Sequence, residues 1–181
     1  MGPLFQGLSG KHMDDAFFMQ RERRRLIALA VVCIALVGGA LYLQFAAHED
    51  PCPLCILQRY AFLAIALFAL VGSGLRNWGG IRATETLILL AAVCGVAAAG
   101  KHVWTLAHPA SSCGFDALEP IVDALPLAKI WPSVFQVSGL CETPYPPILG
   151  LSLPQWALVA FVLTFVLVAR SMQRGRPSRA A

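Results

Sequence analysis

Four long runs of apolar residues dominate this chain and leave it few ways to fold. They cover residues 26–46, 56–75, 84–104 and 153–169, and their few charges lie near the ends of the runs. Each run approaches the ~20 residues that a helix needs to cross about 30 Å of hydrocarbon. A helix also satisfies its own backbone hydrogen bonds in lipid. The sequence therefore predicts an all-α integral membrane protein, built as a bundle of four transmembrane helices.

The composition is typical of a chain that is embedded in a lipid bilayer. Hydrophobic residues make up 57% of it and charged residues only 13%, against about 25% charged in a typical soluble protein. The net charge of +4 is small, and the basic residues lie in short flanks between the apolar runs. This pattern indicates membrane topology and argues against a nucleic-acid partner.

Arginines mark one side of the predicted bundle. They lie before the first run, between the second and third runs, and after the fourth: Arg21, Arg23, Arg24, Arg25, Arg76, Arg82, Arg170, Arg174, Arg176 and Arg179. The loops at residues 47–55 and 105–152 hold six acids and one lysine, Lys129, and Lys101 lies near the outer end of the third run. The positive-inside rule predicts cytoplasmic termini, with these two loops on the outer side.

The segments outside the membrane domain are short. We expect the domain to span residues 26–170, between a cytoplasmic flank at 13–25 and a cytoplasmic tail at 171–181. Residues 1–12 resemble a protease site and linker left from an expression tag, which makes Met13 or Met19 a plausible native start.

The second outer loop contains one helical pattern. Its apolar residues recur at roughly helical spacing between acids, at Leu118, Ile121, Val122, Leu125 and Leu127. We expect a short amphipathic helix in the plane of the membrane interface. Prolines are expected to break the remainder into turns, at Pro126, Pro132, Pro144, Pro146 and Pro147.

Location sorts the six cysteines. Cys33 and Cys94 lie within apolar runs, where a cysteine behaves as a small hydrophobe, and we assign them no role. Cys52 and Cys55 form a C-x-x-C pair at the start of the second run, where the helix N-terminus favours a reactive thiolate. A structural disulfide or half of a zinc site is the alternative. No further ligands follow at zinc-binding spacing, so no metal is predicted.

Two polar residues lie near this pair. Arg59 follows Cys55 by four residues and shares its helix face, so it could stabilise a Cys55 thiolate and attract a reduced quinone oxygen. Snorkelling to the headgroups is the alternative for Arg59. His102, near the outer end of the third run, could bond a quinone carbonyl or manage its protons. Its position alone favours an ordinary interfacial histidine with a solvated tip.

The last two cysteines lie in the long outer loop. Cys113 and Cys141 are separated by 27 residues and would pair in an oxidising compartment. A passive staple, worth ~3–4 kcal/mol in the chain-entropy model, is one interpretation. A second dithiol pair on the same side of the membrane makes a relay possible, because a thiolate can attack a neighbouring disulfide and pass on two electrons.

Several motifs together resemble one known family, DsbB, the disulfide bond formation protein B family. The central motif is Pro51-Cys52-Pro53-Leu54-Cys55-Ile56-Leu57-Gln58-Arg59-Tyr60. Further matching stretches are Leu125-Pro126-Leu127, Trp131-Pro132-Ser133-Val134-Phe135, Ser138-Gly139-Leu140-Cys141 and Gly150-Leu151-Ser152-Leu153-Pro154-Gln155-Trp156. The resemblance runs from about residue 26 to residue 170.

The resemblance implies a function and a place in the cell. Such a protein would lie in the bacterial inner membrane, reoxidise the periplasmic thiol oxidase DsbA, and pass electrons to ubiquinone or menaquinone. By position, Cys113 would be attacked by DsbA, Cys141 would be its disulfide partner, and Cys52 and Cys55 would receive the electrons. Cys55, Arg59 and His102 would face the quinone, which is expected near the outer leaflet between the first, second and fourth helices.

Three other functions remain open at the level of sequence. A quinone-linked thiol oxidase of the vitamin K epoxide reductase type also has a C-x-x-C, but there it follows the loop pair, whereas here it comes first. A non-enzymatic membrane subunit with structural disulfides is a second alternative. Metal transport is a third, although the helices lack the acidic and histidine ligands of a cation path.

Overall fold

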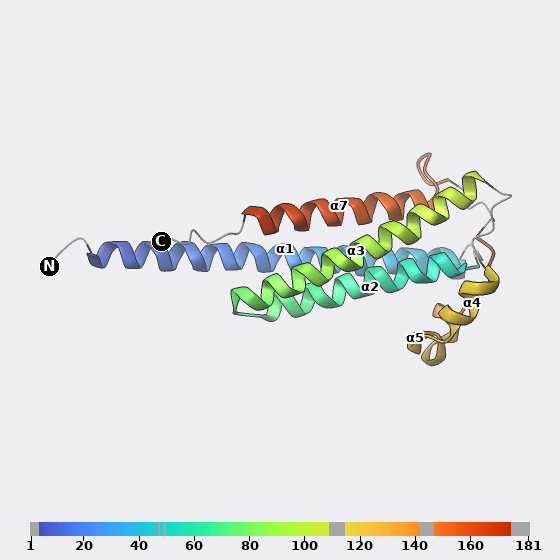
Figure 1. The fold of residues 1–181 in the computed structure, drawn as a ribbon, viewed down its shortest axis with the longest axis horizontal. Helices are drawn as coiled ribbons and strands as arrows, with labels where there is room; N and C mark the ends of the chain where they lie inside the picture. The colour runs from blue at the N-terminus through green and yellow to red at the C-terminus, as the bar shows by residue number, and fades with distance from the viewer. Residues whose placement is uncertain (1–3, 47, 49, 109–114, 142–146, 175–181) are drawn as a thin grey trace.

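The computed structural model describes residues 4–46, 48, 50–108, 115–141 and 147–174 of the chain. Over these residues the fold is helical, with a single isolated β-bridge between Ile148 and Leu151 (Figure 1). The elements, in order, are α1 Leu4–Ala46, α2 Pro53–Gly74, α3 Trp78–Ala107, α4 Phe115–Asp123, α5 Pro126–Ile130, α6 Pro132–Phe135 and α7 Leu153–Arg174.

Four of these helices are long and apolar enough to cross a membrane, which confirms the predicted fold class. The spans are Met19–Ala46, Pro53–Gly74, Trp78–Ala107 and Leu153–Arg174. Their outward faces carry large apolar side chains, and Val31, Leu67 and Leu167 are 60%, 58% and 63% exposed. Contact of such apolar surfaces with lipid tails costs no free energy, whereas their exposure to water would be unfavourable. The chain is therefore a multi-pass membrane protein.

The helices run further than the apolar runs that predicted them. α1 continues through residues 13–25, and α3 begins six residues before and ends three residues after the predicted range of 84–104. Arginine and glutamate are good helix formers, so a helix can continue past the end of its apolar run. α2 starts three residues early because Pro53 fits the first turn of a helix.

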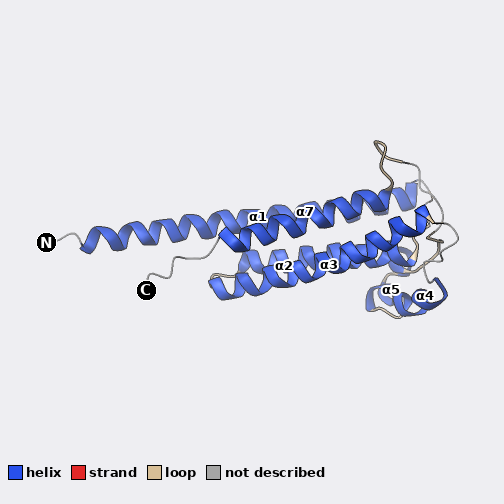
Figure 2. Ribbon diagram, turned by 45° about the horizontal axis from the view of Figure 1, so that its top comes forward, coloured by secondary structure: helices blue, strands red, loops and turns tan. Residues whose placement is uncertain are grey.

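The long helices pack in sequence, α1 on α2, α2 on α3 and α3 on α7 (Figures 1 and 2). Small residues allow the close approach of α3 and α7. A Cβ atom added to Gly95 would lie 2.3 Å from the ring of Phe161. That ring also stacks on Phe62 of α2, with centroids 4.0 Å apart. Phe161 thus connects three helices at the centre of the bundle, in the manner of small-residue packing in membranes.

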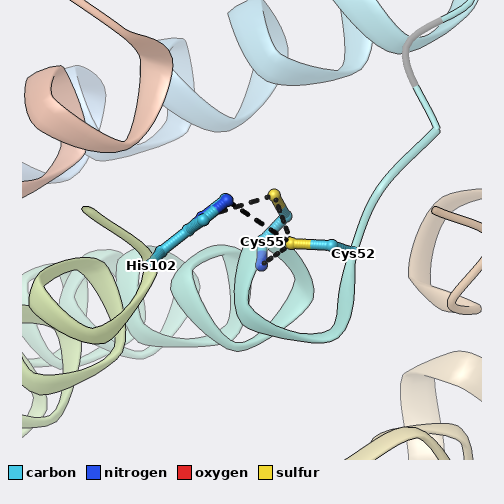
Figure 3. Close-up of side chains that lie close together, drawn as sticks. All are labelled: Cys52, Cys55 and His102. Carbon is cyan, nitrogen blue, oxygen red and sulfur yellow. Dashed lines mark hydrogen bonds between the residues drawn. The ribbon is translucent and has the colours of Figure 1, made fainter. Parts of the chain in front are cut away.

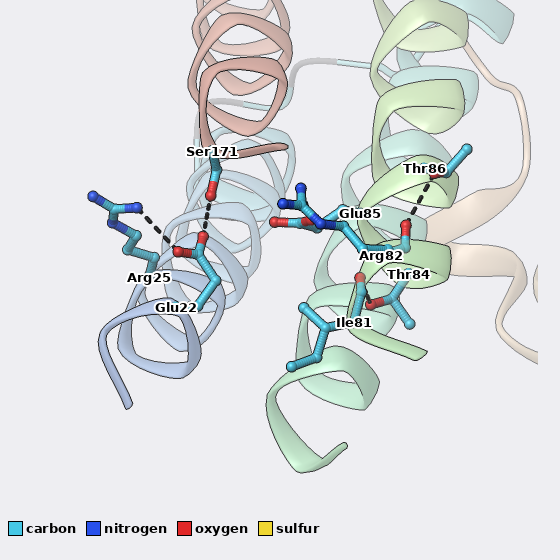
Figure 4. Close-up of polar contacts among 8 residues, drawn as sticks. All are labelled: Glu22, Arg25, Ile81, Arg82, Thr84, Glu85, Thr86 and Ser171. Carbon is cyan, nitrogen blue, oxygen red and sulfur yellow. Dashed lines mark hydrogen bonds and ion pairs between the residues drawn. The ribbon is translucent and has the colours of Figure 1, made fainter. Parts of the chain in front are cut away.

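A cluster of polar residues joins α1 to α7 at the arginine-rich end of the bundle (Figure 4). Glu22 of α1 and Glu85 of α3 are both buried. Glu22 accepts hydrogen bonds from Arg25 at 3.0 Å and from the Ser171 hydroxyl of α7. Arg82 lies 3.0 Å from Glu85. Because a buried carboxylate needs partners, these contacts hold the ends of α1 and α7 in register.

The second outer loop folds into short helices beside the far end of the bundle. α4 contains Leu118, Ile121 and Val122 of the predicted amphipathic pattern, whereas Leu125 and Leu127 lie beyond its end. A single amphipathic helix at the membrane interface stays a prediction. Pro126 and Pro132 were predicted to break the chain into turns, which is wrong in detail. Each opens a short helix, α5 or α6, because proline's missing N–H and fixed φ suit the first helical position. Pro144 and Pro146 lie outside the described residues.

Candidate functional site

The C-x-x-C pair lies where α2 begins, and Cys52 is the N-cap residue of that helix. The backbone N–H of Cys55 donates to the Cys52 sulfur at 3.3 Å. The two Sγ atoms are 3.0 Å apart, and neither cysteine forms a disulfide (Figure 3). The cap places both sulfurs at the positive end of the α2 dipole, where a thiolate is stabilised.

His102 of α3 lies directly against the two sulfurs (Figure 3). Its Nε2 atom is 3.8 Å from the Cys52 sulfur and its Nδ1 atom 3.9 Å from the Cys55 sulfur. The side-chain amide of Gln58 lies 3.4 Å from Nδ1. His102 has no exposed surface, so its interpretation as a solvated interfacial residue is wrong. Because α3 continues past it to Ala107, the ring lies inside the bundle.

The two thiols differ in their surroundings. Cys52 is fully buried, whereas Cys55 is partly exposed. The hydrogen bond that the Cys52 thiol donates to Cys55, together with burial, raises the pKa of Cys52. Both causes favour the protonated form, since a buried thiolate loses its hydration. Cys55 is therefore the more accessible member of the pair.

Arg59 also points into the protein. It is buried and donates through Nη1 to the side-chain oxygen of Gln44 at 2.8 Å and to the carbonyl of Val134 at 2.6 Å. Gln44 in turn donates to the carbonyl of Ser133 at 2.9 Å. These bonds attach α6 to α1 and α2, and they show that snorkelling to the headgroups is the wrong interpretation of Arg59. Gln44 and Gln58 are polar residues of the site whose contacts the sequence did not predict.

Cys141 lies beside the C-x-x-C pair. It is buried and disulfide-bonded, and it forms one buried cluster with Cys52 and Leu54, against which Cys55 packs. The backbone N–H groups of Ser138 and Gly139 both donate to the carbonyl of Pro51 at 3.1 Å. Cys113, the other predicted loop cysteine, lies outside the described residues.

Gly139 explains how the loop comes so close to the C-x-x-C segment. A Cβ atom at this position would lie 2.3 Å from the carbonyl oxygen of Asp50. Only glycine permits this approach of two backbones. The Ser138 hydroxyl adds a 3.3 Å contact to the Asp50 carboxylate. The loop residues before Cys141 are thus fixed to the residues before Cys52.

A cavity of about 1050 Å³ opens between α1 and α7, with α2 along one side. Cys55, Gln58 and Arg59 line its end at the start of α2, whereas Glu22 and Ser171 line its arginine-rich end. Most of the remaining lining is aliphatic. An elongated apolar cavity with polar groups at its ends suits an amphiphilic ligand.

The remaining cysteines are separate from this site. Cys33 is buried and Cys94 is exposed, and both are free. Cys33 lines the cavity between α1 and α7, but its surroundings in α1 are apolar. In contrast, Cys52, Cys55 and His102 offer three ligand atoms within 4.8 Å of one another, which is a set that can hold a metal ion. No local sequence pattern predicted this set, because His102 comes from a different helix.

Comparison with known proteins adds a family match. The model of a family described as disulfide bond formation protein DsbB matches residues 22–170. A disulfide bond formation protein B from Pseudomonas syringae pv. tomato is 58% identical over 163 residues, which cover 90% of this chain and 96% of the relative. A protein of the same description from Burkholderia pseudomallei is 56% identical over 158 residues, which cover 87% of this chain and 94% of the relative.

Proposed function

The chain belongs to the disulfide bond formation protein B (DsbB) family, and from this premise we propose that it is a quinone-dependent protein-disulfide oxidoreductase. It would reoxidise a DsbA-type thiol oxidase in the periplasm and pass the electrons through two cysteine pairs to the quinone pool. The family match over residues 22–170 favours this function over the vitamin K epoxide reductase alternative.

The observation that carries the proposal is the position of Cys141. A disulfide-bonded cysteine from the loop is buried in the same cluster as Cys52, and the reduced Cys55 packs against that cluster. A purely structural staple needs no contact with a second dithiol. A relay does need it, because thiol–disulfide exchange requires direct attack of one sulfur on another. This contact also argues against a non-enzymatic subunit.

The proposed relay proceeds by two exchanges on the protein's own sulfurs. We propose Cys113 as the partner of Cys141, since Cys33, Cys52, Cys55 and Cys94 form no disulfide. A thiolate of the reduced DsbA-type partner attacks Cys113, and Cys141 leaves as a thiolate. The second partner thiol then releases oxidised DsbA. The resulting dithiol reduces a Cys52–Cys55 disulfide, so two electrons arrive at α2 and the loop disulfide forms again.

The residues around Cys55 fit a quinone. The cavity between α1 and α7 has an apolar lining for an isoprenoid tail, and Gln58 and Arg59 at its outer end can donate hydrogen bonds to carbonyl oxygens. When bound, ubiquinone or menaquinone supplies an acceptor for two electrons and two protons. On the protein side, Cys55 presents its sulfur to the cavity, and His102 lies within reach of both thiols to take a proton.

The charge distribution supports an orientation in the bacterial inner membrane. α1 starts and α7 ends at one end of the bundle, and α4 and α5 lie at the other (Figure 1). The arginines of α1, the α2–α3 connection and α7 gather at the first end. We place that end in the cytoplasm and the cysteine pairs in the periplasm, following the positive-inside rule.

A reconstituted assay tests the proposal. Purified protein is mixed with a reduced DsbA-type protein and a soluble quinone, and quinone reduction is followed optically. We expect activity to fall to background in Cys52→Ser, Cys55→Ser, Cys113→Ser and Cys141→Ser. The exposed Cys94→Ala is the matched control and should keep full activity. Full activity in Cys113→Ser would remove the loop pair from the mechanism.

A further inference from the structure

We infer that the reduced Cys52–Cys55 pair and His102 form a binding site for one thiophilic divalent cation, with Zn²⁺ as the natural representative. The three residues each present one ligand atom, and these atoms lie within 4.8 Å of one another. Two soft sulfurs and an imidazole nitrogen form a donor set that binds zinc and cadmium in preference to hard cations. The inference needs neither DsbA nor quinone to be correct.

The spacing of the ligand atoms is close to that of a tetrahedral site. With Zn–S bonds of about 2.3 Å and Zn–N bonds of about 2.0 Å, ligand atoms lie roughly 3.5–3.8 Å apart. The Cys52 sulfur and His102 Nε2 are 3.8 Å apart. The two sulfurs, at 3.0 Å, are the pair that must separate. Rotation of the partly exposed Cys55 side chain achieves this without moving α2.

Gln58 supplies the outer support that zinc-binding histidines need. Its side-chain amide lies 3.4 Å from Nδ1 of His102, on the ring atom away from Cys52. The amide atom that faces Nδ1 is the Gln58 nitrogen. Turning the amide by 180° brings its oxygen to Nδ1, which then donates its proton, and His102 Nε2 keeps its lone pair for the metal. Such a partner fixes both the tautomer and the ring orientation.

The charge of the complex suits its buried position. Two thiolates and a neutral imidazole carry the charge of −2 that a divalent cation cancels, so the loaded site is neutral. Cys52 and His102 have no exposed surface, and a buried site of net charge would be costly. Cys55 lines the cavity, which leaves one side from which a water molecule can complete the coordination.

The cation and the disulfide exclude each other. Oxidation of Cys52 and Cys55 removes both thiolate ligands, and a bound cation holds the two sulfurs as thiolates that cannot join. The site therefore selects the reduced state, and an ion bound there stops the pair from being oxidised. Zinc or cadmium would act as a reversible inhibitor that traps the reduced enzyme.

Metal binding to the full chain tests the inference. In the Cys113→Ser, Cys141→Ser background, reduced protein is titrated with Zn²⁺ against a chromophoric chelator. We expect one ion per chain, a loss of affinity of roughly 10- to 100-fold in Gln58→Leu, and a larger loss in His102→Ala. The Cys94→Ala variant is the matched control and should bind as the background protein does. Undiminished binding in His102→Ala would overturn the inference, because the dithiol alone would then be the chelator.

Two further measurements do not depend on a variant that folds. Oxidation of the same protein with a quinone-free disulfide oxidant should abolish zinc binding. X-ray absorption at the zinc edge of the reduced, loaded protein should show two sulfur neighbours and a histidine nitrogen. A first shell with two sulfurs and only oxygen neighbours, or binding that survives oxidation, would refute the site. Since no electron transfer is measured, a failure here is separate from a failure of the proposed oxidoreductase activity.

Discussion

At the scale of single residues, the two thiols of the C-x-x-C pair have different tasks because their surroundings differ. Cys52 caps α2, is fully buried and donates a hydrogen bond to its partner. Cys55 is partly exposed and lines the cavity. The more accessible sulfur is the better placed nucleophile. From the local geometry we therefore assign to Cys55 the step in which electrons leave the C-x-x-C pair.

The pH dependence follows from this asymmetry. The pKa of Cys52 is raised by its hydrogen bond to Cys55 and by burial, so Cys52 stays protonated at neutral pH and becomes reactive only as pH rises. We expect iodoacetamide to label Cys55 well before Cys52 in the reduced protein, as read by mass spectrometry.

Because the thiolate is the reacting form, turnover should slow as pH falls from about 8 to about 5. Equal labelling of the two thiols, or a flat pH profile, would contradict this assignment.

Arg59 makes a separate prediction at the same scale. Its guanidinium donates to Gln44 and to the Val134 carbonyl, and it lines the cavity beside Cys55. We expect Arg59→Ala to raise the KM for quinone at least about tenfold, since about 1.4 kcal/mol of binding corresponds to tenfold, and to slow the partner's attack on the loop much less. Arg59→Lys, which keeps the charge, should fall between. Steady-state kinetics with each substrate varied in turn would show this, and an unchanged KM for quinone would rule it out.

At the scale of elements, the central feature is the attachment of the second outer loop to the start of α2. Two backbone hydrogen bonds to Pro51 and the close approach at Gly139 keep Cys141 beside Cys52. The short helices of the loop also form a buried cluster with Ile56 of α2, and together these contacts fix the position of Cys141. The proposed relay would depend on this attachment and not on α4 or α5 alone.

Gly139→Ala tests the attachment. The added methyl group would lie 2.3 Å from the Asp50 carbonyl oxygen, so the loop must move away from α2. We expect turnover with the DsbA-type partner to fall at least about tenfold, because small displacements of reacting groups have large effects on rate. Reduction of quinone by a small dithiol acting directly on Cys52 and Cys55 should be nearly unchanged.

The matched control is Gly100→Ala in α3, where a Cβ atom meets nothing within 4 Å. That variant should retain full turnover and be slightly more stable, since alanine is the better helix former. Equal turnover in Gly139→Ala and Gly100→Ala would mean that the position of the loop does not matter.

The sequence predicted the elements better than their contacts. Hydrophobic length alone identified the four helices, and the C-x-x-C at the start of α2 was visible as a motif. His102 was misjudged because its burial depends on where α3 packs, 47 residues away from Cys55 along the chain. The bonds from Arg59 to Gln44 and Val134 are likewise tertiary, and no local pattern announces them.

At the scale of the whole molecule, the bundle is open on one side. α1, α2, α3 and α7 pack in sequence, and the space between the first and the last is the cavity that reaches from Cys55 to Glu22. The Glu22–Ser171 hydrogen bond closes its arginine-rich end (Figure 4). A long amphiphile can enter such a groove from the membrane without crossing water.

Filling the groove should therefore affect the quinone and nothing else. Ala35 of α1 lines the cavity, and we expect Ala35→Trp to raise the KM for a long-tailed quinone about tenfold or more, with a smaller effect on a short-tailed analogue. Ala97→Trp, on an exposed face of α3 away from the cavity, is the control and should leave both KM values unchanged. Identical effects of the two variants would refute entry through the groove.

The transfer of electrons from the loop pair to the C-x-x-C pair is the step on which the whole mechanism depends, and it can be measured alone. Oxidised protein, freed of quinone, is mixed with one equivalent of reduced DsbA-type partner, quenched with an alkylating reagent and analysed by mass spectrometry. The mechanism predicts that Cys52 and Cys55 become labelled in the wild type but stay unlabelled in Cys141→Ser. If the partner is oxidised while Cys52 and Cys55 remain unlabelled in the wild type, the two pairs do not exchange electrons and the relay is contradicted.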